Sequence, residues 1–166
     1  MAVVSNRRGL SFIELIITVV ILSVLGMLVL PLTQMTAKRV KELRLRQNLR
    51  EIRTAIDKYK DDKDFLLKQG KAPPTNINDT GYPKTLDVLL MGEPDPTDPT
   101  GKRLKKYLRI IPRDPFNSYK GDDSEKMWHL GCNKDKRGDD WCKDDVFDVY
   151  SLSGETAIDG TIYKDW

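Results

Sequence analysis

Hydrophobic residues are distributed very unevenly along this chain. A long apolar run occupies residues 10–37, and its part from Leu15 to Ala37 contains 23 consecutive residues without a charge. About 20 apolar helical residues cross the hydrocarbon core of a bilayer, so the run predicts a transmembrane helix. The rest of the chain is polar and charged, which predicts a water-exposed domain over residues 38–166.

A second hydrophobic pattern follows the apolar run. Its members recur at steps of four, three, four and three residues, and they are Leu45, Leu49, Ile52, Ile56 and Tyr59. This spacing places them on one face of a helix. It therefore predicts that an amphipathic helix covers residues 38–61 and buries this face under a small sheet.

The later segments predict shorter elements. Residues 71–81 and 92–99 are rich in Pro, Gly, Asn and Asp, which predicts loops, and residues 86–91 between them predict a short helix. β-Branched and aromatic residues predict strands at 126–130 and 146–152. The expected fold class is α+β. A long N-terminal helix, transmembrane in its first half, packs by its second half against a small antiparallel sheet domain with a C-terminal loop.

Composition narrows the classes of function. The chain has 166 residues and a net charge of +3, which is room for about one ordinary domain and too little charge to indicate nucleic acid. His129 is the only histidine, and there is no G-x-S-x-G motif, no Gly-rich phosphate loop and no His-Glu metal motif. These absences from the sequence predict a protein that is not an enzyme.

Charge is sorted by sign along the domain. Residues 38–60 contain nine basic and three acidic residues, whereas residues 122–166 contain twelve acidic and six basic ones. A basic stretch beside a membrane span is typical of attraction to anionic lipid, and an acidic stretch is typical of a solvated surface. In a third interpretation, the basic collar of one copy meets the acidic face of another copy in a stack.

The start of the chain differs from a secretory signal peptide. Arg7, Arg8 and Gly9 come directly before the apolar run, and no small-residue cleavage site follows it. Cleavage after Gly9 would remove only residues 1–9 as a leader and would leave the apolar helix in place. Glu14 lies inside the run, where a carboxylate is costly unless it is solvated at the interface or paired. The second alternative offers a partner, the α-amino group that cleavage creates on Leu10 in the same or a neighbouring copy.

The segment Arg7-Arg8-Gly9 followed by Leu10-Ser11-Phe12-Ile13-Glu14-Leu15 resembles the class III signal of type IV pilins and type II secretion pseudopilins. The resemblance implies that prepilin peptidase cuts between Gly9 and Leu10 and N-methylates Leu10. It also implies that Glu14 is needed for assembly, and that Pro31 stands where the family often has a helix-kinking proline. By its own chemistry Pro31 removes a helical hydrogen bond.

Three further segments, 107–116, 147–152 and 159–166, are similar to the major pseudopilin of type II secretion. This resemblance implies a structural subunit that polymerises into a periplasmic pseudopilus and drives protein export across the outer membrane. The implied location is the bacterial inner membrane, single-pass, with the C-terminal domain in the periplasm. Counting the basic residues that flank the span would instead favour a cytoplasmic C-terminal side.

The implied partners are other copies of the chain, minor pseudopilins, the inner-membrane assembly platform with its ATPase, prepilin peptidase and membrane lipid. Two alternatives share some of these features. One is a type IV pilin or minor pilin of a surface pilus. The other is a membrane-anchored periplasmic metal-binding module that never polymerises, although a mere anchor needs neither Gly9 nor Glu14.

The two cysteines, Cys132 and Cys142, predict a disulfide if the domain lies in an oxidising compartment. The competing interpretation is a zinc site, but His129 and these two cysteines leave it without enough ligands. We therefore favour the disulfide.

Calcium is the one cofactor that the sequence suggests. The resemblance implies a structural calcium in the loop after the last strand, where this chain offers oxygen ligands from Ser151, Leu152, Glu155 and Asp159. A weaker candidate numbers the segment from Asn133 to Asp144 as an EF-hand loop, with Asp135 and Gly138 at positions 3 and 6. Its position 5 is occupied by Arg137, so the alternative is a solvated loop closed by the disulfide.

Overall fold

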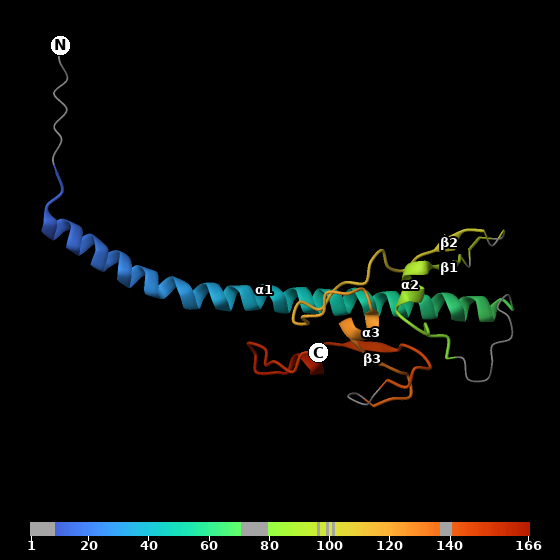
Figure 1. The fold of residues 1–166 in the computed structure, drawn as a ribbon. Coiled ribbons are helices and arrows are strands. Elements are labelled where there is room, and N and C mark those ends of the chain that lie inside the picture. Colours follow the sequence, from blue (N-terminus) through green and yellow to red (C-terminus); the bar gives the residue numbers. More distant parts are fainter. Residues whose placement is uncertain (1–8, 71–79, 96, 99, 101, 137–140) are drawn as a thin grey trace, which may run out of the picture. The chain divides into compact units, whose positions relative to one another are not determined.

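The computed structural model describes residues 9–70, 80–95, 97–98, 100, 102–136 and 141–166, with the side chains of all of these except 28–32. The chain divides into two compact units, Met1–Val40 and Lys41–Trp166. One helix, α1 (Phe12–Lys68), runs through both of them (Figure 1). We describe each unit by itself.

In the first unit the apolar side chains of α1 are exposed. Phe12 and Leu22 are 79% and 67% exposed. Many other apolar side chains between Leu10 and Met27 are exposed to a similar degree. Two polar side chains are satisfied within the helix, since the hydroxyls of Thr18 and Ser23 donate to backbone oxygens of the preceding turn. Among the described residues, no helix combines the length and the apolar character that a membrane span requires.

In the second unit the amphipathic face of α1 is buried. All five residues of the predicted stripe are at most 5% exposed, so this prediction is confirmed; they are Leu45, Leu49, Ile52, Ile56 and Tyr59. They belong to one core with Trp128, Val146, Val149 and Tyr163. Burial of this apolar area stabilises the unit at roughly 25 cal/mol per Å².

The described strands form two separate antiparallel pairs instead of the single sheet that the sequence predicted. β1 (Glu93–Pro94) pairs with β2 (Leu104–Lys105), and β3 (His129–Gly131) pairs with β4 (Asp148–Tyr150). In Figure 1, β1 and β2 lie to one side of α1 and β3 lies to the other. The fold is therefore α+β, with the second part of α1 between two small sheets.

The short helices are α2 (Asp87–Met91), α3 (Ser124–Met127) and the 3₁₀ helix η1 (Tyr163–Asp165). α3 corrects a prediction, because residues 126–127 were expected in a strand. The physical reason is a helix cap: the side chain of Asp123 accepts a hydrogen bond from the amide of Glu125, 3.1 Å away.

Helix α1 also continues seven residues beyond the predicted end at residue 61. Its last turns are held by β2 and the residues after it, since Asp62 accepts a hydrogen bond from the hydroxyl of Tyr107 at 2.7 Å and pairs with Lys105 at 2.6 Å. Burial and this bond to a carboxylate raise the pKa of Tyr107. The helix ends where Gly70 takes a left-handed φ of 65°, which suits glycine.

Candidate functional site

The predicted processing point precedes α1. Gly9 and Leu10 lie outside the helix and are exposed, with Leu10 at 74%, and a Cβ added to Gly9 would meet no atom within 4 Å. A peptidase needs an accessible, non-helical backbone, and this bond has both properties. The basic residues Arg7 and Arg8 lie outside the described residues.

Glu14 lies in the first turn of α1, four residues after Leu10. Exposed apolar side chains surround it in the sequence, with Ile13 and Leu15 at 61% and 52% exposed. The N-terminal turn of a helix favours a negative charge, which suits a carboxylate at this position. Its pairing with an amino terminus stays a prediction. Pro31 lies within α1, but its side chain is outside the described part.

Two of the residues expected to hold calcium are already engaged by protein groups. The hydroxyl of Ser151 is buried and donates to Asp114 at 2.6 Å, while it accepts from the amide of Ser153 at 3.0 Å. Asp114 is itself buried and also accepts from the amide of Phe116. This pair joins the loop after Pro112 to the end of β4.

Asp159 is engaged more extensively. One carboxylate oxygen accepts from the amide and hydroxyl of Thr161, at 3.0 and 2.6 Å, and the other pairs with Arg46 at 3.1 Å. The hydrogen bonds from Thr161, and then the charge of Arg46, lower the pKa of Asp159. Glu155 and Leu152 are exposed on the same loop. Calcium binding by these residues stays a prediction, and it would require Asp159 to exchange partners.

The C-terminal segment is fixed on α1 by charged and polar side chains that the sequence analysis missed. The carboxylate of Glu42 accepts from the amide of Ile158 and the hydroxyl of Tyr163, both at 2.8 Å. Burial and this carboxylate raise the pKa of Tyr163. The charge pattern did not indicate these contacts, because Glu42 is an acidic residue of the basic stretch and its partners are a backbone amide and a hydroxyl.

Arg53 is the second such anchor. Its guanidinium donates to Asp148 at 2.6 Å and to the backbone oxygens of Val149 and Trp166 at 2.9 and 3.0 Å. Arg46 stacks 4.2 Å from the ring centroid of Trp166. Two ion pairs, Arg46–Asp159 and Arg53–Asp148, thus join the basic and acidic stretches within one chain, and these charges are not available for the proposed stacking of copies.

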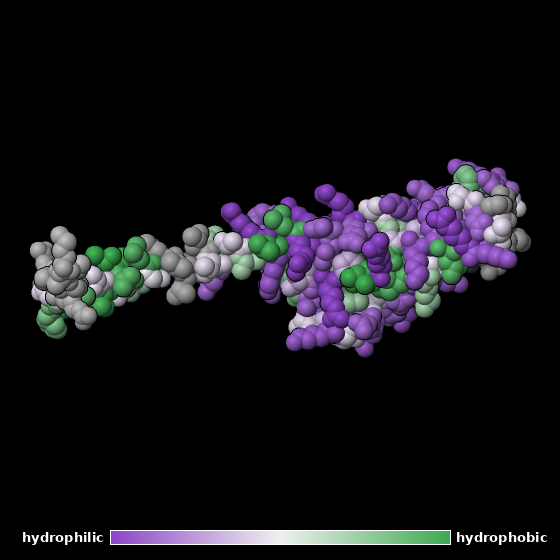
Figure 2. Space-filling view, turned by 90° about the horizontal axis from the view of Figure 1, so that it is seen from above, coloured by the Kyte–Doolittle hydropathy of each residue, from purple (hydrophilic) through white to green (hydrophobic). Residues whose placement is uncertain are grey.

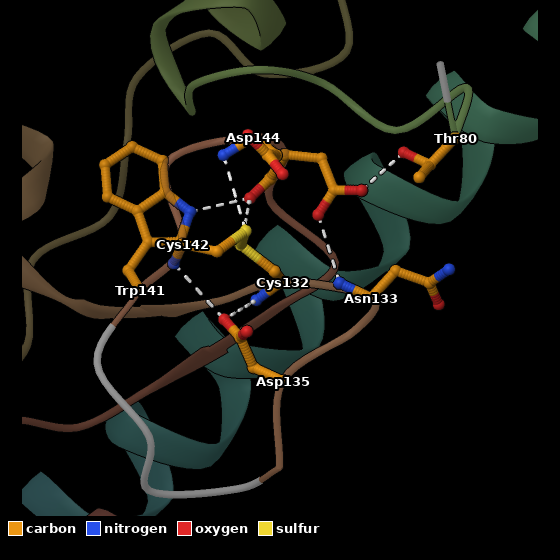
Figure 3. Close-up of a disulfide and its surroundings, with 8 residues drawn as sticks. Thr80, Cys132, Asn133, Asp135, Trp141, Cys142 and Asp144 are labelled. Carbon is orange, nitrogen blue, oxygen red and sulfur yellow. Dashed lines mark hydrogen bonds between the residues drawn. A yellow bond between two sulfur atoms is a disulfide. The ribbon is translucent and has the colours of Figure 1, made fainter. Parts of the chain in front are cut away.

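The two cysteines form a disulfide between Cys132 and Cys142 (Figure 3). The carboxylate of Asp135 lies beside it and accepts from the amides of both cysteines, at 3.1 and 3.3 Å. Asp145 accepts from the amide of Asn133 and from the hydroxyl of Thr80. The indole of Trp141 donates to the backbone oxygen of Asp145 at 2.6 Å. The insert is therefore closed by one covalent bond and a hydrogen-bond network.

Within the described part of the chain, one group of three potential metal ligands occurs, formed by Cys132, Asp135 and Cys142. The disulfide leaves no thiolate for a soft metal such as zinc. The EF-hand candidate overlaps this group through Asp135, whose carboxylate faces the cysteine amides, and its Arg137 and Gly138 lie outside the described residues. His129 is a residue of β3, and its ring lies 6.1 Å from that of Tyr150.

Comparison with known proteins finds one informative relative. The chain is similar to the type II secretion system core protein G of Pseudomonas aeruginosa, with 30% identity over 126 residues that cover 69% of this chain and 82% of the relative. No family model matches the chain. No solved structure matches it.

Proposed function

The chain belongs to the family of the type II secretion system core protein G, the G-type pseudopilins, which are structural subunits of a pseudopilus and not enzymes. From this membership we propose that the chain polymerises into a periplasmic filament and drives the export of proteins across the outer membrane. The observation that carries the proposal is the N-terminal arrangement: an exposed Gly9–Leu10 bond, Glu14 in the first helical turn, and an apolar helix surface that its own unit leaves uncovered.

The proposed cycle begins in the inner membrane. Prepilin peptidase removes residues 1–9, methylates Leu10 and leaves residues 10–37 as the anchor, with the domain of residues 38–166 in the periplasm. The anchor comprises the whole apolar run, of which the side chains of 28–32 lie outside the described part. Exposed apolar residues are costly in water, so this surface favours lipid or other copies of the same helix.

Assembly then replaces lipid by protein. The apolar helices of many copies bury one another, and Glu14 of one copy pairs with the amino group of Leu10 in a neighbour, which compensates a charge that is costly in lipid. In this proposal the pairing fixes the axial register between subunits. The other participants are the minor pseudopilins and the assembly platform with its ATPase.

The proposal is tested first by the intact mass of the protein extracted from membranes, made with and without a co-expressed prepilin peptidase. We expect loss of Met1 to Gly9 and the gain of one methyl group only when the peptidase is present. A Gly9→Leu variant is the control that should remain unprocessed. An unprocessed mass in every sample would contradict the proposal and favour an anchored module. Imaging of assembled filaments then separates a pseudopilus from a surface pilus.

Calcium in the C-terminal loop is a second part of the proposal. The loop presents Glu155 and Asp159 together with backbone oxygens, which is the ligand chemistry that calcium prefers. Binding of calcium to the folded chain would raise its melting temperature by mass action. We expect this rise in the full chain in detergent at millimolar calcium, and a smaller rise in Glu155→Gln. Magnesium is the matched control, and equal melting temperatures with and without calcium would remove the site.

A further inference from the structure

A large open groove runs along the second unit between α1 and residues 107–110. Its volume is about 820 Å³. Arg50 and Lys58 line it from α1, and Arg109 and Ile110 line it from the opposite wall. We call this feature the cationic groove and define it by these four residues.

The positive charges of this groove have no ion-pair partner among the residues that the structure describes. Arg50, Lys58 and Arg109 form no ion pair with any residue that the structure describes, and Glu51 is the one acidic residue among those that line the groove. Neighbouring cations of α1 differ, because Arg46 and Arg53 are paired with Asp159 and Asp148. The groove therefore presents three cations and one carboxylate to an external anion.

Large apolar side chains stand beside these cations. Ile110 is 72% exposed and also lines the next groove along the surface, of about 390 Å³. Met91 and Leu104 are 71% and 58% exposed at the end of α2 and in β2, and α2 is tied to this wall because the oxygen of Leu89 accepts from the amides of Tyr107 and Leu108. Figure 2 shows small hydrophobic patches surrounded by hydrophilic side chains on the second unit.

We propose that the cationic groove binds the head groups of an anionic lipid bilayer, with Ile110 entering the interface beside them. Cations next to exposed aliphatic side chains are the combination that holds proteins at a charged membrane surface. The inference rests on the proposed function, because the membrane anchor would keep the domain near lipid and let a weak surface suffice.

A second copy of the chain is the competing occupant. Two carboxylates of the acidic region, those of Asp148 and Asp159, are already paired with the chain's own arginines and are not available to a partner copy. The exposed apolar residues are also separated from one another by cations in the sequence. Apolar side chains that are scattered among cations suit insertion into a fluid lipid interface more than packing against a complementary protein surface.

The test uses the full chain reconstituted into vesicles, with the photoreactive amino acid p-benzoylphenylalanine replacing Ile110. One set of vesicles contains phosphatidylglycerol and phosphatidylcholine, and the other contains phosphatidylcholine alone. On irradiation we expect a lipid adduct in the anionic vesicles. Its yield should be at least about five-fold lower in the neutral vesicles, and high salt should also lower it. The same amino acid at Phe147, which is 43% exposed and does not line the groove, is the positional control and should give little adduct.

A matched pair of variants tests whether the adduct depends on the positive charge of the groove. Lys58→Gln should lower the adduct yield roughly five-fold, the effect expected for one basic residue at a charged membrane surface, whereas Lys68→Gln removes one charge from the same helix outside the groove and should leave it unchanged. An adduct to a second copy, or equal lipid yields in both kinds of vesicle, would overturn the inference. Flotation of the same vesicles tests the anchor separately: protein that fails to float contradicts the proposed membrane function, whereas protein that floats without the adduct contradicts only the groove.

Discussion

The two parts of α1 differ in whether their apolar side chains are buried. In the first unit, apolar side chains such as Ile17 and Leu22 are half or more exposed, whereas in the second unit Ile52 and Ile56 are fully buried. The first part makes its helical hydrogen bonds while its side chains stay exposed. The second part is covered by residues from further along the chain, between Leu86 and Tyr163.

This difference separates the apolar side chains and charges that one chain can bury or pair by itself from those that it cannot. The second unit buries its own stripe and pairs many of its own charges. The first unit leaves an apolar surface exposed, and such a surface is stable only in contact with another apolar surface. This requirement agrees with a family whose members are structural subunits. Changes in the first part should therefore alter assembly, and changes in the second part should alter stability.

The largest expected effect is on assembly. Glu14→Ala removes the carboxylate proposed to pair with a neighbour's amino terminus, so we expect membrane insertion to persist and filaments to be lost. Electron microscopy of assembled material measures this, and thermal unfolding should show the second unit unchanged. Thr18→Ala, one turn further along α1, is the control that should assemble. Normal filaments from Glu14→Ala would remove the register role of this residue.

The next effect contrasts two chemically identical substitutions. Ile52→Ala opens a cavity in the core and should lower the free energy of unfolding by about 2–5 kcal/mol. Ile17→Ala shortens an exposed side chain and should leave this free energy within about 0.5 kcal/mol. Urea unfolding of the full chain in detergent, followed by the fluorescence of buried Trp128, measures both. Equal losses would show that the first part also packs within its own chain.

Removal of the disulfide should have a smaller effect that is confined to the second unit. Replacing Cys132 and Cys142 together by Ala frees a loop of about ten residues, and we expect a loss of about 2–3 kcal/mol in the free energy of unfolding. The same urea titration measures this loss. Because Asp135 and Asp145 also hold the loop, helical circular dichroism should stay constant, and a loss of helix would contradict this local role.

Acid should have the smallest effect, on the connection between β1 and β2. Hydrogen bonds from Thr100, Arg103 and Lys102 lower the pKa of Asp98 to about 2. A lowered folded pKa stabilises the turn above the ordinary pKa near 4, and this contribution disappears as the pH falls through about 2. Hydrogen exchange at the amides of Thr100, Lys102 and Arg103, which donate to Asp98, should accelerate over that range. Asp98→Asn should make the exchange rate of this turn independent of pH, after correction for intrinsic exchange.

Several features of the fold could be predicted because they depend on local spacing. The steps between Leu45 and Tyr59 identified the buried face of α1, and the apolar residues from Leu10 onward identified the exposed part. The pair β1–β2 could not be predicted, since each strand has two residues and β1 contains Pro94. The amino acids alone gave no local reason for these strands to form.

The residues of the candidate site also fall into two groups, those that could be predicted from local sequence and those that could not. Gly9, Leu10 and Glu14 were identified from adjacent residues, whereas Asp114, Glu42 and Arg53 acquire their importance only from partners far along the chain. The side chain of Asp123 is an intermediate case, because an aspartate directly before Ser-Glu-Lys is a local signal for the start of a helix, and the structure shows this cap.

The sequence by itself determined the long helix and the apolar surface from Leu10 to Met27, and it carries the proposed processing signal, because each depends on residues within a few turns of one another. Only the tertiary structure decided which charges are used internally. Arg53 finds Asp148 while Arg50, three residues earlier, finds no ion pair among the described residues. That difference depends on which side of α1 the distant chain covers, and residue order does not encode it locally.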